Sequence, residues 1–227
     1  MQKKVFYTEL SYVLGLVIMA FGAAFTEKAN FGMSMVVAPA YILHLKVSEL
    51  LPWFTFGVAE YVFQGFLIIL TVIIMRRLKA AYLFSFVTAV IYGTFLDAAM
   101  LLIAPLPENT LVIRIFWYVI GAVFCALAVS FFFHTYISPE AYELIVKEIP
   151  QKFNCNINKV KTAYDCLSIV LSVTLSFIFF GFGTFKGIGV GTVACALFNG
   201  FFIGKFSKLL EKHFDFQDKL KIQKYFK

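Results

Sequence analysis

Six long apolar runs limit what this chain can fold into more than any other feature of the sequence. They lie at residues 10–25, 53–75, 82–104, 111–134, 163–182 and 187–206. A helix needs about 20 predominantly apolar residues to cross the hydrocarbon core of a bilayer. A lone strand there would leave its backbone N–H and C=O groups unpaired, so each run is predicted to be a helix. The sequence therefore predicts an all-α, polytopic membrane protein with about six transmembrane helices.

The composition supports a single membrane domain over residues 1–227. Of the 227 residues, 61% are hydrophobic and only 15% are charged, an apolar excess that does not suit a water-soluble domain. The formal charge of +7 does not indicate a nucleic-acid partner, because the basic residues stand at the ends of the apolar runs. The expected partner is the lipid bilayer.

The basic residues also predict the sidedness of the chain. If the N-terminus is cytoplasmic, four of the 20 Lys and Arg residues lie outside and the remaining 16 lie inside. The four outer residues are Lys28, Lys46, Arg114 and Lys186. Because Lys and Arg concentrate in cytoplasmic loops, both termini are predicted to be cytoplasmic, with a basic tail at 211–227.

Two further segments, 31–45 and 136–150, are helix-like but too short to cross a bilayer. Ser34 and Ser138 are candidate N-caps near their starts. The segments either re-enter the membrane or lie flat on its two surfaces. A group of charged residues favours the surface placement for the polar face of the second segment, namely Glu140, Glu143, Lys147 and Glu148.

Alignment of Ser34 with Ser138 reveals a candidate internal repeat with halves 1–106 and 107–210. Both halves read as a span, a short helix, a span, a turn and a span, and "YGTFLD" (92–97) falls close to "NGFFIG" (199–204). Three spans per half would give the halves opposite orientations, which is a recurrent plan among transporters. The pattern favours a 3+3 inverted repeat.

The stretch "GVGTVACALFNG" (189–200) resembles the closing motif of the YczE/YyaS/YitT type of bacterial integral membrane proteins. The turns at Ser34 and at Ser138-Pro139 resemble the serine–proline turn of that family after its first helix. The resemblance covers most of the chain. It implies a multi-span protein of the bacterial plasma membrane and no particular activity.

Glu60 and Gln64 stand one helical turn apart on one face of the second span, and Asp97 lies deep in the third. A charge at the bilayer centre costs about 3 kcal/mol on insertion scales, so these groups need a reason to be there. One reason is a shared site that contacts a substrate or carries protons. The alternative is a structural hydrogen bond between helices, with Glu60 protonated or paired with Lys46 or Lys28.

The remaining polar candidates are weaker. Asn199 in the sixth run, together with Ser34 and Ser138, is a further candidate for substrate contact or proton coupling, although an asparagine there can also bond across a helix contact. His134 and Asp165 are expected near the cytoplasmic interface, where water can satisfy them.

Four glycines form two pairs with small-xxx-small spacing, Gly187/Gly191 and Gly200/Gly204. Such pairs let membrane helices approach closely, so we expect them to pack helices together.

No catalytic, nucleotide-binding or metal-ligand spacing stands out, so we expect a protein that is not an enzyme and has no cofactor or metal. The leading hypothesis is a secondary transporter for a small polar solute, with protons as the candidate coupling ion. The alternatives are a substrate-binding membrane subunit that depends on a partner, and a non-transporting scaffold or accessory protein. Homo-oligomers and membrane partners stay open.

Overall fold

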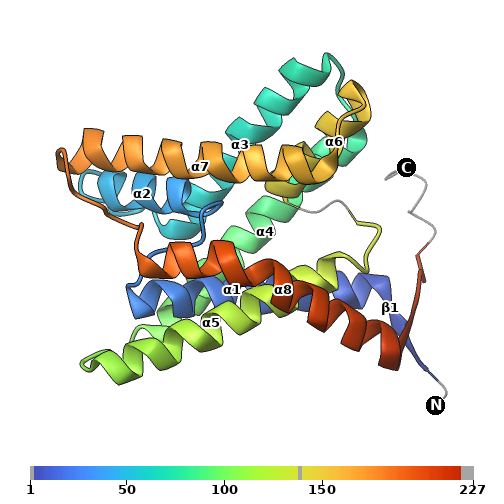
Figure 1. The fold of residues 1–227 in the computed structure, drawn as a ribbon, viewed down its shortest axis with the longest axis horizontal. Coiled ribbons are helices and arrows are strands. Elements are labelled where there is room, and N and C mark those ends of the chain that lie inside the picture. Colours follow the sequence, from blue (N-terminus) through green and yellow to red (C-terminus); the bar gives the residue numbers. More distant parts are fainter. Residues whose placement is uncertain (1–2, 138–139, 221–227) are drawn as a thin grey trace.

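The computed structural model describes residues 3–137 and 140–220 (Figure 1). Their helices are α1 (Thr8–Ala29), α2 (Ala38–Val47), α3 (Phe56–Met75), α4 (Ala80–Ile103), α5 (Leu111–Phe132), α6 (Ala141–Phe153), α7 (Ile157–Phe180) and α8 (Val190–His213), and their strands are β1 (Lys4–Tyr7) and β2 (Phe214–Gln217). Six of these helices, all but α2 and α6, are long and apolar enough to cross a membrane. The predicted all-α, multi-pass membrane fold is confirmed.

Two spans extend at one end well over a helical turn beyond the predicted apolar runs. α7 starts at Ile157, before the predicted 163, and α8 continues to His213, past the predicted 206. The added turns are rich in lysine, which can extend a helix beyond the hydrocarbon while its charged end reaches water. The tail predicted from 211 is therefore helix to His213, followed by β2.

α1 and α5 pack against each other and run in opposite directions, in the lower part of Figure 1. Ser11, early in α1, donates to the carbonyl oxygen of Phe131, late in α5, over 2.8 Å. Further along, a Cβ on Gly121 would lie 2.8 Å from the carbonyl oxygen of Gly22. A Cβ on Gly22 would lie 2.7 Å from the sulfur of Cys125. The two backbones meet here because neither glycine carries a side chain.

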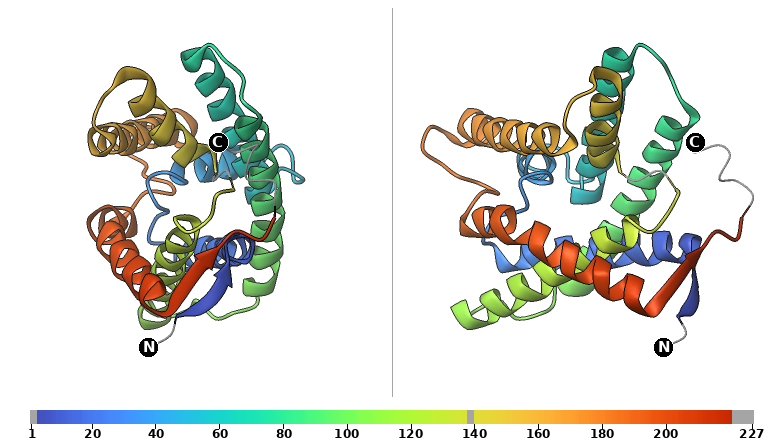
Figure 2. Two further views of the ribbon diagram at one scale, coloured as in Figure 1. Left: turned by 90° about the vertical axis from the view of Figure 1, so that its right-hand side faces the viewer. Right: turned by 45° about the vertical axis from the view of Figure 1, so that its right-hand side comes forward.

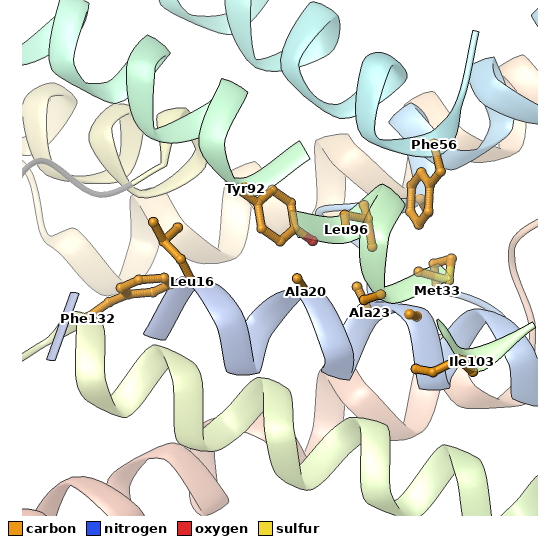
Figure 3. Packing of buried hydrophobic residues seen from close by; sticks show 12 residues of the cluster. Leu16, Ala20, Ala23, Met33, Phe56, Tyr92, Leu96, Ile103 and Phe132 are labelled. Atoms are coloured by element: carbon orange, nitrogen blue, oxygen red, sulfur yellow. The ribbon is translucent and has the colours of Figure 1, made fainter. Parts of the chain in front are cut away.

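α4 runs parallel to α1. Tyr12 and Thr88 are hydrogen-bonded at 2.7 Å, and Lys28 donates to the carbonyl oxygen of Ala104 at 2.8 Å, with the same separation of 76 residues in both pairs. The hydrophobic core fills this contact, with Leu16, Ala20 and Ala23 of α1 facing Tyr92 and Leu96 of α4 (Figure 3).

α8 has the equivalent position beside α5. Tyr118 donates to the carbonyl oxygen of Gly191, and Ser130 donates to that of Ile203 at 3.0 Å, both across 73 residues. α5 and α8 are therefore parallel, as α1 and α4 are. These directions match the alternation of six consecutive spans.

α6 runs along the second half of α3. Its first residue, Ala141, donates its N–H to the side chain of Gln64 at 3.2 Å, and Lys152 near its end donates to the carbonyl oxygen of Ile74. A helix lying flat on the surface would cross the end of α3 and not follow its side. The structure therefore favours the re-entrant placement of α6.

The short helices begin differently from the sequence prediction. The N-cap of α2 is Val37, and the carbonyl oxygen of Ser34 accepts the N–H groups of Val37 and Ala38 in the turn before it. A proline in the first turn starts the helix instead, since its fixed φ suits that position. Ser138 lies outside the described residues, and the N-cap of α6 is Glu140.

The two ends of the described chain meet. β1 and β2 pair in parallel, with Lys4 opposite Phe214, and the Glu9 carboxylate accepts the N–H groups of Lys219 and Leu220. Both ends therefore lie on one side of the bundle, as an even number of spans requires.

The C-terminal half of α6 is fixed to the turn between α3 and α4 by Glu148. Its carboxylate accepts hydrogen bonds from Lys79 at 2.6 and 2.8 Å and from the Tyr82 hydroxyl at 2.7 Å. Burial alone would raise the pKa of Glu148, but these hydrogen bonds outweigh it and hold the pKa below its ordinary value of 4.5.

Glu148→Gln is expected to lower the free energy of unfolding by about 1–3 kcal/mol at pH 7, because it removes a charge-assisted hydrogen bond. Since the folded-state pKa is lowered, this contribution is present above pH 4.5 and is lost as the pH falls through the folded value. Thermal unfolding of both proteins in detergent from pH 7 to pH 3 should show the difference shrinking. Glu49→Gln, in an exposed pair with Lys46, is the control. A Glu148→Gln difference that persists at pH 3 would rule out the ionic origin.

Candidate functional site

A cavity of about 350 Å³ lies at the centre of the bundle, between the helices of the first half and those of the second. α1, α4, α5, α6, α7, α8 and the turn before α2 all contribute to its wall. Two predicted site residues, Ser34 and Asn199, line it from opposite halves. The volume is in the lower part of the range of roughly 300–1,000 Å³ that is usual for ligand pockets.

Glu60 and Gln64 are fully buried beside this cavity and belong to a larger polar cluster than the sequence predicted. The Gln64 amide nitrogen lies 3.3 Å from Glu60 Oε2 and also 3.3 Å from Glu140 Oε2. The Tyr142 hydroxyl donates to Glu60 Oε2 over 2.8 Å. The one-turn pairing of Glu60 with Gln64 is confirmed, and α6 adds a second carboxylate to it.

The two carboxylates are not fully satisfied by the described residues. Glu60 Oε1 and Glu140 Oε1 are buried and have no hydrogen-bond partner there. Removing a carboxylate from water costs several kcal/mol unless a partner replaces the water. One shared amide cannot compensate two negative charges, although the N-terminal end of α6 is favourable for a negative charge at Glu140. The pair is therefore chemically suited to hold a proton or a cation.

Glu140 was placed by sequence reasoning on a polar surface, and the structure buries it with 6% of its surface exposed. The charged residues around it suggested a solvated face, but Glu148 of the same segment is buried as well and pairs with Lys79. One sequence signal for this burial is that Glu140 stands at the start of a helix too short to span and is followed by Ala141 and Tyr142.

Asp97 does not join Glu60. Its carboxylate accepts the Thr55 hydroxyl at 2.6 Å and the N–H of Gly57 at 2.8 Å, so it binds the first turn of α3 to α4. Satisfying the free N–H groups of a helix start is a structural task.

Neither lysine considered as a partner for Glu60 reaches it. Lys28 lies 3.6 Å from Glu108, and Lys46 lies 2.6 Å from Glu49. Both pairs are outside the cluster, so Glu60 has no lysine partner among the described residues.

His134 and Asp165 lie away from the carboxylate pair. The imidazole of His134 is 3.2 Å from the Glu211 carboxylate and stacks on Phe216 at a centroid distance of 4.3 Å, so it supports the contact between α5 and the end of α8. Asp165 lies 3.7 Å from Lys161, which lines the cavity.

The four glycines divide into two groups. Gly187, with φ of 71°, lies in the loop before α8, and a Cβ on Gly191 would come within 2.6 Å of the Tyr118 ring. Gly187 therefore lets this loop approach α2, whereas Gly191 lets α8 approach α5. A Cβ on Gly200 or Gly204 would meet nothing within 4 Å, so that pair packs no helices among the described residues.

The described residues contain no group of three or more His, Cys, Asp or Glu side chains placed to hold a metal ion. No metal site is therefore assigned to them.

A family model described as a family of unknown function (DUF6198) matches residues 6–208, which include α1 to α7 and most of α8. No curated protein and no solved structure matches the chain. The match agrees with the expectation of a family without an assigned activity, and the specific resemblance to the YczE/YyaS/YitT type stays a prediction. The chain belongs to the DUF6198 family of unknown function.

Proposed function

We propose that this protein is a secondary transporter that moves a small polar solute across the bacterial plasma membrane in exchange for protons. The observation that carries the proposal is the cavity between the two halves of the bundle, with the buried Glu60–Glu140 pair at its wall. Solute and proton sites of many transporters lie at the interface between inverted repeats, near the bilayer midplane.

The helix contacts support a repeat with halves 1–106 and 107–210. α1 packs on α4 as α5 packs on α8, α2 packs on α7 as α6 packs on α3, and α2 packs on α3 as α6 packs on α7. α1 and α5 are the corresponding first helices of the two halves, so swapping the halves leaves the α1–α5 contact unchanged. The correspondence is what an inverted repeat produces.

Two contacts between the described helices lack a comparable counterpart. α4 touches α6, whereas α8 does not pack on α2 in the same way. α3 packs along α4, whereas α7 and α8 make no comparable contact and lie apart in both views of Figure 2. The second half therefore leaves the cavity less covered than the first. In an alternating-access cycle, closure of α7 toward α8 is the movement that this difference suggests.

The proton role rests on Glu60 and Glu140. A carboxylate that is buried beside a second one is neutralised by a proton when no other cation is present. The pair can then hold either a proton or a bound solute beside it, but not both. This exclusion couples solute transport to proton transport.

The test is solute-driven proton movement in liposomes that contain the purified full chain and an internal pH-sensitive dye. Permanently charged and zwitterionic solutes are added outside, because they do not cross the lipid unaided. At least one solute should change the internal pH. Ala122→Phe, which fills the cavity from α5, should reduce that response at least about tenfold, equal to about 1.4 kcal/mol.

Glu49→Gln is the matched control, since Glu49 is exposed and lies outside the cavity. A response that Ala122→Phe leaves unchanged would contradict transport through the cavity. The lack of any response across the panel would contradict transport by the isolated protein.

A second candidate function is a substrate-binding subunit that works with a membrane partner. The observation in its favour is the exposure of the last two spans, since 17% of the most apolar window of α7 and 6% of that of α8 are buried within the chain. Such faces meet either lipid or another protein. Solute binding without transport, and co-purification with a partner from the native membrane, would support this function over the first.

A further inference from the structure

We infer that the transported solute is a small organic cation of the ammonium type, with its charge beside Glu140 and Glu143 and its carbon body against the aromatic wall of the cavity. The inference rests on the proposed transport function for the direction of movement, and on the cavity alone for the chemistry of binding.

The charges at the cavity are predominantly acidic. Its described charged lining residues are Glu140, Glu143 and Lys161, and Lys161 lies 3.7 Å from the carboxylate of Asp165. Glu60 is a further carboxylate directly behind the wall, and the Gln64 amide connects it to Glu140. An anionic solute would meet like charges here, whereas a cation would meet opposite ones.

One unpartnered carboxylate oxygen belongs to a residue of the cavity wall, and a second lies behind that wall. Glu140 lines the cavity, is 6% exposed, and its Oε1 has no partner among the described residues. Glu60 Oε1 is also buried and unpartnered there. The Gln64 amide alone does not offset the cost of burying two carboxylates. A positive charge near Glu140 would offset it.

The rest of the wall indicates an organic cation. Aromatic rings come from four of the helices that line the cavity: Tyr92, Tyr118, Phe132, Tyr142 and Tyr164. Aromatic faces attract ammonium groups, and several rings around one pocket are typical of quaternary ammonium recognition. Methionine, alanine and valine side chains cover much of the remainder. A small inorganic cation would need several charged oxygen ligands at once, and the described residues place no group of three or more His, Cys, Asp or Glu side chains together.

The test is calorimetric binding of benzyltrimethylammonium to the purified full chain in detergent. A second pair of probes isolates the charge, because choline and 3,3-dimethylbutan-1-ol have nearly the same shape and differ in the positive nitrogen. We expect benzyltrimethylammonium and choline to bind, and the neutral alcohol to bind at least about tenfold more weakly.

Glu140→Gln should weaken benzyltrimethylammonium binding at least about tenfold, and Glu49→Gln should leave it unchanged. If Glu140→Gln does not fold, Glu143→Gln provides the same comparison from the first turn of α6. Equal binding of choline and the neutral alcohol would overturn the inference. So would full affinity in a folded Glu140→Gln variant, or in Glu143→Gln where the first does not fold.

Liposome transport separates this inference from the proposed function. Binding of benzyltrimethylammonium that depends on Glu140, without any uptake, would support the cation site and overturn transport by the isolated chain. Proton-coupled uptake of a zwitterionic or anionic solute, with no binding of either ammonium probe, would support transport and overturn the cation site.

Discussion

Gly57→Ala is expected to lower the free energy of unfolding by about 3 kcal/mol or more, the upper end of the usual cost of overpacking. A Cβ at this position would fall well inside contact distance of the Gly93 carbonyl oxygen and 2.7 Å from the Asp97 carboxylate. The first obstacle is backbone, so α3 and α4 must separate. That separation would also break the 2.8 Å hydrogen bond from the Gly57 N–H to Asp97.

The measurement is the free energy of unfolding in mixed detergent micelles, with circular dichroism as the readout. Gly200→Ala is the matched control, since it adds the same methyl group to a membrane helix where nothing lies within 4 Å. We expect that variant to stay within about 0.5 kcal/mol of the wild type. Equal losses at both positions would show that the close approach of α3 and α4 does not limit stability.

Glu60→Gln is expected to reduce proton-coupled transport at least about tenfold, equal to about 1.4 kcal/mol. Glutamine has nearly the same shape and can still accept the Tyr142 hydroxyl through its oxygen, but it cannot gain or lose a proton. The fold should therefore persist while the exchange of solute for protons stops.

Two measurements in liposomes separate these effects. The pH-sensitive dye should report the loss of proton movement, whereas exchange of labelled for unlabelled solute should continue, because it needs no net proton transfer. Glu108→Gln, with an exposed side chain in the turn between α4 and α5, is the control. Unchanged proton movement in Glu60→Gln would exclude Glu60 as a coupling residue and would favour the scaffold hypothesis if no solute is bound either.

The sequence was most informative where the determinant is local. The six spans follow from the length of the apolar runs, and the Glu60–Gln64 contact follows from helical periodicity within α3. Each of these features depends only on residues within a single helix, so the sequence of that helix is enough to predict it.

The candidate site depended on distant residues and was only partly predictable. Glu140 reaches Gln64 across 76 residues because α6 follows the side of α3 and not the membrane surface. Asp97 was expected to join Glu60, but its position on α4 brings it to the free N–H groups at the start of α3. Periodicity does not show which turns of two helices face each other.

The glycines illustrate the same limit. Gly22 and Gly121 bring the backbones of α1 and α5 together, whereas Gly200 and Gly204, which have the expected spacing, face open space. Small residues permit close packing, but the rotation of each helix in the bundle decides whether another helix is there.

By itself, the sequence determined that this chain is a helical, multi-pass membrane protein, because burying the backbone in lipid leaves helices as the only way for separate apolar runs to satisfy their hydrogen bonds. Only the tertiary structure decided that Glu60, Gln64 and Glu140 meet beside a central cavity. The physical reason is that side-chain packing between helices sets their depth, rotation and partners, and that packing involves residues far apart in the chain.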